Sequence, residues 1–401
     1  MKHFYPIIVA LLAFSANAQT INIPDANFKA KLLSSNLTDE MNVARDLSHQ
    51  ALIIDANNDG EIQVEEALNV SFLNIMDSGI ISLDGIENFT NLQSLYCSEN
   101  QIANLDYMLP SLKTLECYGN AITHLAVTNF PQLSTINCNN NLITALDFRS
   151  NAISAADCSD NLISEIHFGA LQYGSIVLRN NLITNLEISD PGNEIEMIDI
   201  SDNPIVNLSI EAYSVDYFVC VNTALINLDL SKIERESPLG NEFYIVNNPF
   251  LRTINFHNGA MDFCIPDPFY DCTNSSFSLD DNPELESVCA DEGNEMSFLQ
   301  PFATAQGFTL TSDCALAVNS NIGLQESVIY PNPADKIVNI HANTAIVQVN
   351  VLNTLGQMVS QIKNASQSYD LTIDIADLKS GTYFVEMLSN SGKSTKKLLK
   401  L

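Results

Sequence analysis

A pattern of leucine, cysteine and asparagine recurs about every twenty residues and constrains the fold more than any other feature of this chain. The motif L-x-x-L-x-C-x-x-N-x-I-x-x-L occurs at Leu92–Leu105, Leu112–Leu125 and Leu133–Leu146. Looser copies begin at Val70 and end near Asn282, so ten copies follow one another, mostly 20 to 22 residues apart. A unit this short cannot bury its own apolar face, and it gains stability by stacking on its neighbours. The sequence therefore predicts a solenoid.

The pattern resembles that of the leucine-rich repeat family over residues 70–288. The resemblance implies an α/β solenoid dominated by short parallel strands. In the copy "SLYCS", strand alternation places Leu95 and Cys97 inside, and Ser94, Tyr96 and Ser98 outside. The repeated asparagine is expected to bond backbone groups in the tight turn after each strand.

The first residues are typical of a secretory signal peptide. Lys2 and His3 precede the apolar run Phe4–Phe14, and the small residues at 16–18 suit a signal peptidase. The run is too short to span a bilayer, and no later run is long and apolar enough for a membrane helix. We expect cleavage after residue 18 and an exported mature chain.

The charge is strongly negative and unevenly distributed. The formal net charge is -31, yet the segment from Ser327 onward holds 7 Lys against 5 Asp and Glu. The rest of the chain holds 10 basic and 43 acidic residues, so we expect no binding to nucleic acid or to an anionic membrane. Solubility outside the cell is the simpler explanation of this acidity, and recruitment of a cationic partner is the alternative. The change of sign marks a domain boundary.

Five of the nine cysteines share the inward position of the repeat. Equivalent residues on stacked strands lie about 4.8 Å apart with parallel side chains, whereas a disulfide needs converging Cβ atoms about 3.8 Å apart. A buried free cysteine behaves as a small apolar residue. We therefore predict that these five are packing residues: Cys97, Cys117, Cys138, Cys158 and Cys220.

The other four cysteines lie outside the repeat position, and export permits them to form disulfides. Four cysteines allow three pairings. We predict Cys264–Cys272 and Cys289–Cys314, the second bond closing a C-terminal cap over residues 289–314. Metal binding is the less favoured alternative, because no paired C-x-x-C spacing is present.

Residues 19–69 are expected to cap the N-terminal end of the solenoid. The segment "IPDANFKAKLL" predicts a short helix with Phe28 and Leu32 on one face. Beyond it, residues 55–66, "DANNDGEIQVEE", fit D-x-[DN]-x-[DN]-G-x₅-E and resemble the calcium loop of an EF-hand.

The resemblance implies one structural calcium ion, held by side-chain oxygens of Asp55, Asn57 and Asp59, the carbonyl of Glu61 and both carboxylate oxygens of Glu66. No convincing entering helix and no second loop are visible, so the expected dissociation constant is about 10⁻⁴–10⁻³ M. The alternative is an acidic turn that caps the following helix.

The C-terminal residues form a separate domain in the sequence. Residues 315–326 are typical of a linker, and short β-rich runs from Ser327 onward predict a small immunoglobulin-like β-sandwich over 327–401. "YPNPA" at 330–334, "VLNTLGQMV" at 351–359, "LKSGTYFVEM" at 378–387 and the terminal "KKLLKL" together resemble the type A C-terminal sorting domain of the type IX secretion system. The resemblance implies passage through the periplasm of a Gram-negative bacterium and export across the outer membrane. It also implies removal of this domain and release of the protein or its attachment to surface lipopolysaccharide.

The outward strand positions are the candidate ligand-binding face. Aromatic and acidic side chains on a concave sheet suit a protein or a glycan, so we predict a secreted or cell-surface, adhesin-like binding protein. No catalytic motif is present and no histidine falls on these positions, so we expect no enzyme; a structural surface-assembly protein and, less favoured, a secreted hydrolase are the alternatives. The predicted binding residues are Tyr96, Glu116, Tyr118, Asp157, Arg179, Asp199, Tyr217 and Tyr244.

Overall fold

The computed structural model describes residues 19–38, 43–234, 242–259, 277–314, 327–342, 345–354, 357–364, 368–389 and 392–401. The predicted signal peptide, the linker 315–326, Cys264 and Cys272 lie outside these residues. The chain divides into two compact units, Met1–Ser312 and Asp313–Leu401, each with its own apolar core.

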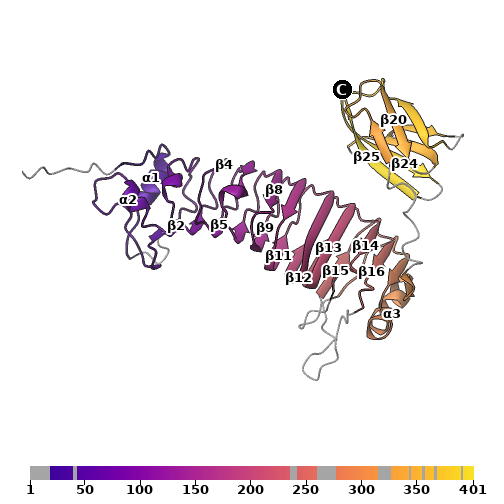
Figure 1. Cartoon of the computed structure of the whole chain (residues 1–401), viewed down its shortest axis with the longest axis horizontal. Helices are drawn as coiled ribbons and strands as arrows, with labels where there is room; N and C mark the ends of the chain where they lie inside the picture. The colour runs from indigo at the N-terminus through magenta and orange to yellow at the C-terminus, as the bar shows by residue number, and fades with distance from the viewer. Residues whose placement is uncertain are drawn as a thin grey trace, which may run out of the picture. The chain divides into compact units, whose positions relative to one another are not determined.

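A ten-stranded sheet forms the exposed face of the first unit. Its strands follow the order of the chain, and all neighbours are parallel except β1, which pairs antiparallel with β2. Figure 1 shows the strands following one another between α2 (Val64–Ala67) and α3 (Asn294–Gln306). The sheet comprises β1 (Ala44–Arg45), β2 (Phe72–Asn74), β3 (Ser94–Tyr96), β5 (Thr114–Glu116), β7 (Thr135–Asn137), β9 (Ile153–Asp157), β11 (Leu171–Val177), β12 (Asn185–Asp199), β13 (Asn207–Val221) and β15 (Glu242–Val246).

The opposite face of the solenoid is built from short strands and 3₁₀ turns. The pair β12 and β13 stays in parallel contact from Asn185↔Asn207 to Asp199↔Val219, with one register shift, so these strands run across both faces. In the described residues, α-helix is confined to the two ends of the unit. The predicted α/β solenoid therefore contains little helix. The opposite face contains η1 (Ile86–Asn88), β4 (Asn104–Leu105), β6 (His124–Leu125), η2 (Val127–Asn129), β8 (Ala145–Phe148), β10 (Glu165–Phe168), β14 (Asn227–Asp229), β16 (Thr253–Asn255), β17 (Ser287–Cys289) and β18 (Thr309–Thr311).

The repeat positions fill the core as predicted, with one exception. Leu95 and Cys97 are fully buried, and the five cysteines of the repeat position are free and buried. Burial raises the pKa of the Cys97 thiol far above its ordinary value, and raises that of Cys220 to about 12. The prediction that Ser98 points outward is wrong: Ser98 is fully buried, because the chain has left the strand after Tyr96 and strand alternation no longer applies.

The repeated asparagines form a ladder of side-chain hydrogen bonds, as expected. Asn161 is representative: its amide donates to the carbonyls of Cys138, Cys158 and Ser159 at 3.0, 3.2 and 2.9 Å, and its Oδ1 accepts the N–H of Ile143 at 3.0 Å. Each such residue thus connects its own turn to the turn before it. The same arrangement recurs at Asn100, Asn120, Asn141, Asn181 and Asn203.

The N-terminal cap contains the predicted helix, α1 (Ala26–Leu33), with Phe28 and Leu32 buried. Asp25 caps this helix with one carboxylate oxygen and accepts the N–H groups of Ile81 and Ser82 with the other, at 2.8 and 3.0 Å. Burial opposes ionisation, but these backbone hydrogen bonds outweigh it and lower the pKa of Asp25. Asp25 therefore fastens the cap to the first repeat.

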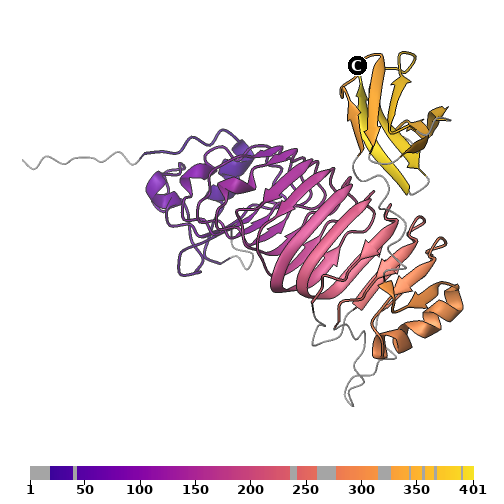
Figure 2. The ribbon, with the colours of Figure 1, turned by 45° about the vertical axis from the view of Figure 1, so that its right-hand side comes forward.

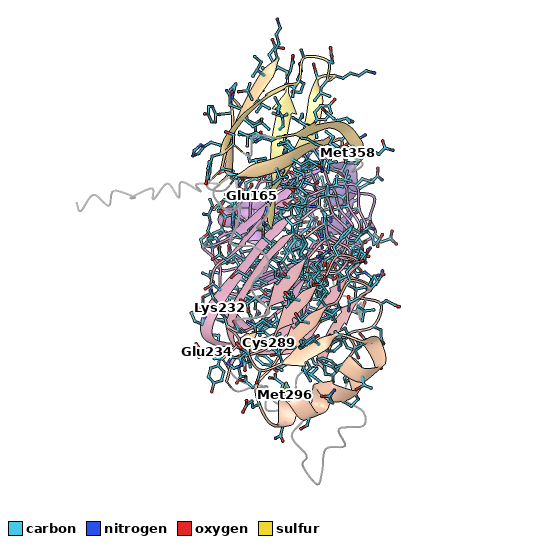
Figure 3. The ribbon with its side chains drawn as sticks, turned by 90° about the vertical axis from the view of Figure 1, so that its right-hand side faces the viewer. Glu165, Lys232, Glu234, Cys289, Met296 and Met358 are labelled. Atoms are coloured by element: carbon cyan, nitrogen blue, oxygen red, sulfur yellow. The ribbon has the colours of Figure 1, made fainter. Side chains whose placement is uncertain are left out.

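The C-terminal end of the first unit is covered by α3, which carries Met296 (Figure 3). Leu299 is fully buried, and the ring of Phe277 packs edge-on against Phe298 and Phe302 with centroids 5.2 and 5.1 Å apart.

The second unit consists of two antiparallel sheets, as the predicted β-sandwich requires (Figure 2). Its core is aliphatic and includes Val338, Val349 and Leu398. One sheet has the order β19 (Ser327–Tyr330), β20 (Ile337–Ala342), β23 (Asp370–Asp374), and the other β22 (Met358–Lys363), β21 (Ile346–Leu352), β24 (Gly381–Ser389), β25 (Gly392–Lys400).

Candidate polar pocket and binding face

The exposed face of the ten-stranded sheet carries one continuous row of side chains. Backbone pairing puts the members of this row directly opposite one another on successive strands. Five of the predicted binding residues lie in the row: Tyr96, Glu116, Asp157, Asp199 and Tyr244. The whole row is Tyr96, Glu116, Asn137, Asp157, Val177, Asp199, Val219 and Tyr244.

The remaining predicted binding residues lie beside this row. Tyr118 and Arg179 each follow a row residue by two positions, in the turn after the strand, whereas Tyr217 precedes Val219 and pairs with Met197 and Glu242. The eight residues therefore share one face but do not form one cluster.

A polar pocket of about 740 Å³ lies where the strands of the middle repeats end. It brings together two of the predicted residues, Asp157 and Arg179. The six others that line it are Asn139, Ser159, Asp160, Asn180, Asp202 and Asn222.

Hydrogen bonds between neighbouring turns hold the pocket side chains in place. The amides of Asn180 and Asn222 donate to Asp160 and Asp202 at 2.7 and 3.0 Å. Arg179 Nε donates to Asp202 Oδ2 at 3.1 Å. On the other wall, Asp157 accepts the amide of Asn139 at 3.0 Å and the hydroxyl of Ser159 at 2.7 Å. Each of the three carboxylates is thus hydrogen-bonded to a side chain of a neighbouring turn.

Acidic groups also influence one another along the row. Partial burial raises the pKa of Glu116, and the charge of Asp157 adds to that effect, while a hydrogen bond with Asn137 opposes it. This stretch of the face therefore favours a positive group.

Four of the six additional pocket residues follow from the turn geometry rather than from strand alternation. Asp160, Asn180, Asp202 and Asn222 have φ values of 52°, 55°, 55° and 56°. Asparagine and aspartate tolerate this left-handed conformation better than other non-glycine residues. An Asn or Asp directly before the ladder position in successive repeats is the sequence signal that could have identified them.

The N-terminal end of the face is aromatic. The rings of Phe72 and Tyr96 meet edge-on with centroids 5.1 Å apart, and the guanidinium of Arg45 lies 5.2 Å from the centre of the Phe72 ring. This arrangement stabilises the end of the sheet through a cation–π contact.

The loop 55–66 folds around the side chains of its acidic residues. The carboxylate of Asp55 accepts the N–H groups of Asp59 and Gly60 at 3.1 and 3.0 Å, and Gly60 has a φ of 80°. Glu66 accepts the N–H of Gln63 at 2.9 Å, and Glu61 forms an ion pair with Lys29. A hydrogen bond from the N–H of Glu61 is the main cause of the lowered pKa of Asp59.

Within the described residues, one group of three metal-type ligands lies close together: the ligand atoms of His257, Cys289 and Cys314 lie within 4.8 Å of one another. Both cysteines are disulfide-bonded, which removes the thiolates that a metal would need. Cys289 on β17 is labelled in Figure 3. The pairing of the four cysteines stays a prediction, because Cys264 and Cys272 lie outside the described residues.

Residues 328–400 match the family of secretion system C-terminal sorting domains. The second unit is thus a sorting domain, and the protein is secreted or carried on the outer cell surface through type IX secretion. No helix in the described part of the chain combines the length and hydropathy that crossing a membrane requires.

Several solved structures are similar to this chain. The functional domain of InlJ from Listeria monocytogenes, described as including a cysteine ladder, is 17% identical over 96% of this chain and 98% of its own, with a TM-score of 0.30. Internalin C2 from Listeria monocytogenes is 14% identical over 64% and 92%, with a TM-score of 0.29. Internalin InlF from Listeria monocytogenes is 15% identical over 69% and 85%, with a TM-score of 0.30. No curated protein matches the chain.

Proposed function

We propose that this secreted leucine-rich repeat protein is an adhesin-like binding protein that holds an extracellular protein or glycan on the exposed face of its ten-stranded sheet. The observation that carries the proposal is the polar pocket, in which Asp157 and Arg179 are hydrogen-bonded to side chains of neighbouring turns. Side chains that are already ordered lose little entropy when a ligand binds, so the pocket is suited to specific recognition.

The proposal is tested by probing glycan and extracellular-protein arrays with residues 19–401, the chain without its predicted signal peptide. A double variant, Asp157→Ala with Arg179→Ala, should lose most of the array signal. The matched control is Arg149→Ala, because Arg149 is an exposed arginine that pairs with Asp147 at the end of β8, outside the pocket. Equal signal from the double variant and the wild type would place binding elsewhere and refute the proposed site.

We also propose that the loop 55–66 holds one structural calcium ion. Its residues meet every ligand position of the calcium-loop pattern, Gly60 adopts the left-handed turn that the pattern needs, and Ile62 is fully buried. The loop has no second calcium loop beside it, but its backbone is hydrogen-bonded to the start of the cap: the carbonyl of Ile62 accepts the N–H of Ile21 at 2.8 Å. An ion here would stabilise the cap.

A further inference from the structure

An exposed row of leucines lies in the same turns as the polar pocket. Leu142, Leu162 and Leu182 occupy one position in three successive repeats and are 46%, 45% and 50% exposed. The N–H of Leu162 bonds to the carbonyl of Ile143 at 3.0 Å, and the N–H of Leu182 to that of Ile163 at 2.8 Å. The three side chains therefore stack at about the 4.8 Å spacing of neighbouring strands. We call them the leucine row.

The leucine row and the pocket are adjacent along the chain. Asp160 and Asn180 line the pocket, and each stands two residues before a leucine of the row. The residues between them, Asn161 and Asn181, point into the solenoid and are buried. A contiguous apolar strip bordered by polar groups is typical of a protein interaction surface.

The pocket is acidic overall, with three carboxylates against one guanidinium. The amides of Asn139, Asn180 and Asn222 already donate to carboxylates, and Nε of Arg179 donates to Asp202. Carboxylates outnumber cations in the pocket, and the chain before Ser327 holds 43 acidic against 10 basic residues. The pocket therefore favours a ligand group that carries N–H donors and positive charge.

We propose that the partner is a protein segment in which basic and apolar side chains alternate, with a lysine or arginine entering the pocket and the apolar side chains covering the leucine row. This inference rests on the proposed function and narrows it to one class of partner. A neutral glycan would gain nothing from the negative field and would leave the leucines exposed. A second copy of this chain would bring one acidic surface against another.

The probes are three synthetic peptides of equal length, with alternating Lys and Leu, alternating Lys and Ser, and alternating Glu and Leu. Each is titrated into residues 19–401, with fluorescence anisotropy for affinity and methyl NMR for position. We expect the Lys/Leu peptide to bind tightest and to shift the methyl signals of Leu142, Leu162 and Leu182. Raising NaCl from about 0.1 M to about 1 M shortens the Debye length from about 10 Å to about 3 Å and should weaken this binding.

Two variants separate the apolar and charged parts of the site. Leu162→Ser and Asp160→Asn should each weaken binding of the Lys/Leu peptide about fivefold, as expected for a half-exposed leucine or one screened charge. The control is Leu47→Ser, which removes a leucine that is 54% exposed outside the repeats. Unchanged thermal unfolding of all three variants verifies that they fold.

The outcomes distinguish this inference from the function on which it rests. Preference for the Glu/Leu peptide, or methyl shifts outside the leucine row, overturns the inference. If a glycan binds on the array and its binding depends on Asp157, while the Lys/Leu peptide does not bind, the proposed function stands and the cationic partner is overturned. If nothing binds on the arrays and no peptide binds, the proposed function and the inference are both refuted.

Discussion

Replacing Asn161 by alanine tests what the asparagine ladder contributes to stability. Asn161 is 6% exposed, and its Oδ1 is the acceptor for the buried N–H of Ile143. The carbonyls that its amide reaches keep other donors: Asn141 still donates to Cys138 and Asn181 to Cys158. The main cost is therefore one orphaned N–H, about 1–3 kcal/mol, plus the lost amide bonds, about 1 kcal/mol. Together these predict a loss of about 2–4 kcal/mol.

Urea unfolding measures this loss, and amide hydrogen exchange locates it. The exchange of the Ile143 N–H should accelerate in Asn161→Ala, because it no longer has an acceptor. Asn207→Ala is the control, since the amide of exposed Asn207 donates to the equally exposed Asn185, and it should cost less than about 0.5 kcal/mol. If Asn161→Ala costs no more than this control, the ladder is not what holds the turns together and the reasoning is refuted.

Four further predictions test the cap, the thiols and the export route. Calcium at about 10 mM should stabilise residues 19–401 against urea by about 1.4–2.7 kcal/mol relative to EGTA. Glu66→Gln should remove most of this gain, and identical urea curves of the wild type in calcium and in EGTA would show that the loop is only a turn. Asp25→Ala should lower the melting temperature at pH 7, where the cap is worth about 1 kcal/mol. Because the folded-state pKa of Asp25 is depressed, its contribution is complete above the ordinary pKa of about 3.9 and is lost as the pH falls through the lower folded value, so the two curves should converge in acid. Cys97, Cys117, Cys138, Cys158 and Cys220 should react with iodoacetamide only after unfolding, and modification of native protein would contradict their burial. Fused behind a signal-peptide-bearing reporter, residues 315–401 should carry the reporter out of a host with type IX secretion. Deletion of residues 396–401 should retain the reporter in the periplasm. Export of the reporter without residues 396–401 would show that the end of β25 is dispensable.

The periodic part of the fold could be predicted from the sequence because period and strand alternation are local rules. The burial of Leu95 follows from alternation within β3, and that of Cys97 from the continuation of alternation one residue beyond the end of the strand at Tyr96. The amide bonds of Asn100 follow from its place after that strand. Ser98 marks where the rule stops, since the chain has already turned there.

The polar pocket could not be predicted in the same way, because it depends on contacts between repeats. Asp160 and Asn180 lie in adjacent turns, and the left-handed backbone at both residues brings their side chains together at 2.7 Å. Strand alternation says nothing about such residues. Nor does the motif identify the exposed leucines: Leu162 occupies a variable position, between the ladder asparagine and the next buried isoleucine.

One repeat of the chain already carries a natural substitution in the ladder. Thr223 stands where other repeats have asparagine, and it has no amide with which to reach a carbonyl. The carbonyl of Cys220 instead receives the amide of Asn248 from the next turn at 2.9 Å, while Oδ1 of Asn248 accepts both the N–H and the hydroxyl of Thr223 at 2.9 and 2.7 Å. One donor per carbonyl is therefore sufficient in this solenoid. The same redundancy operates at Cys138 and Cys158 when Asn161 is removed, which is why the orphaned N–H of Ile143, and not the carbonyls, should determine the cost of that substitution.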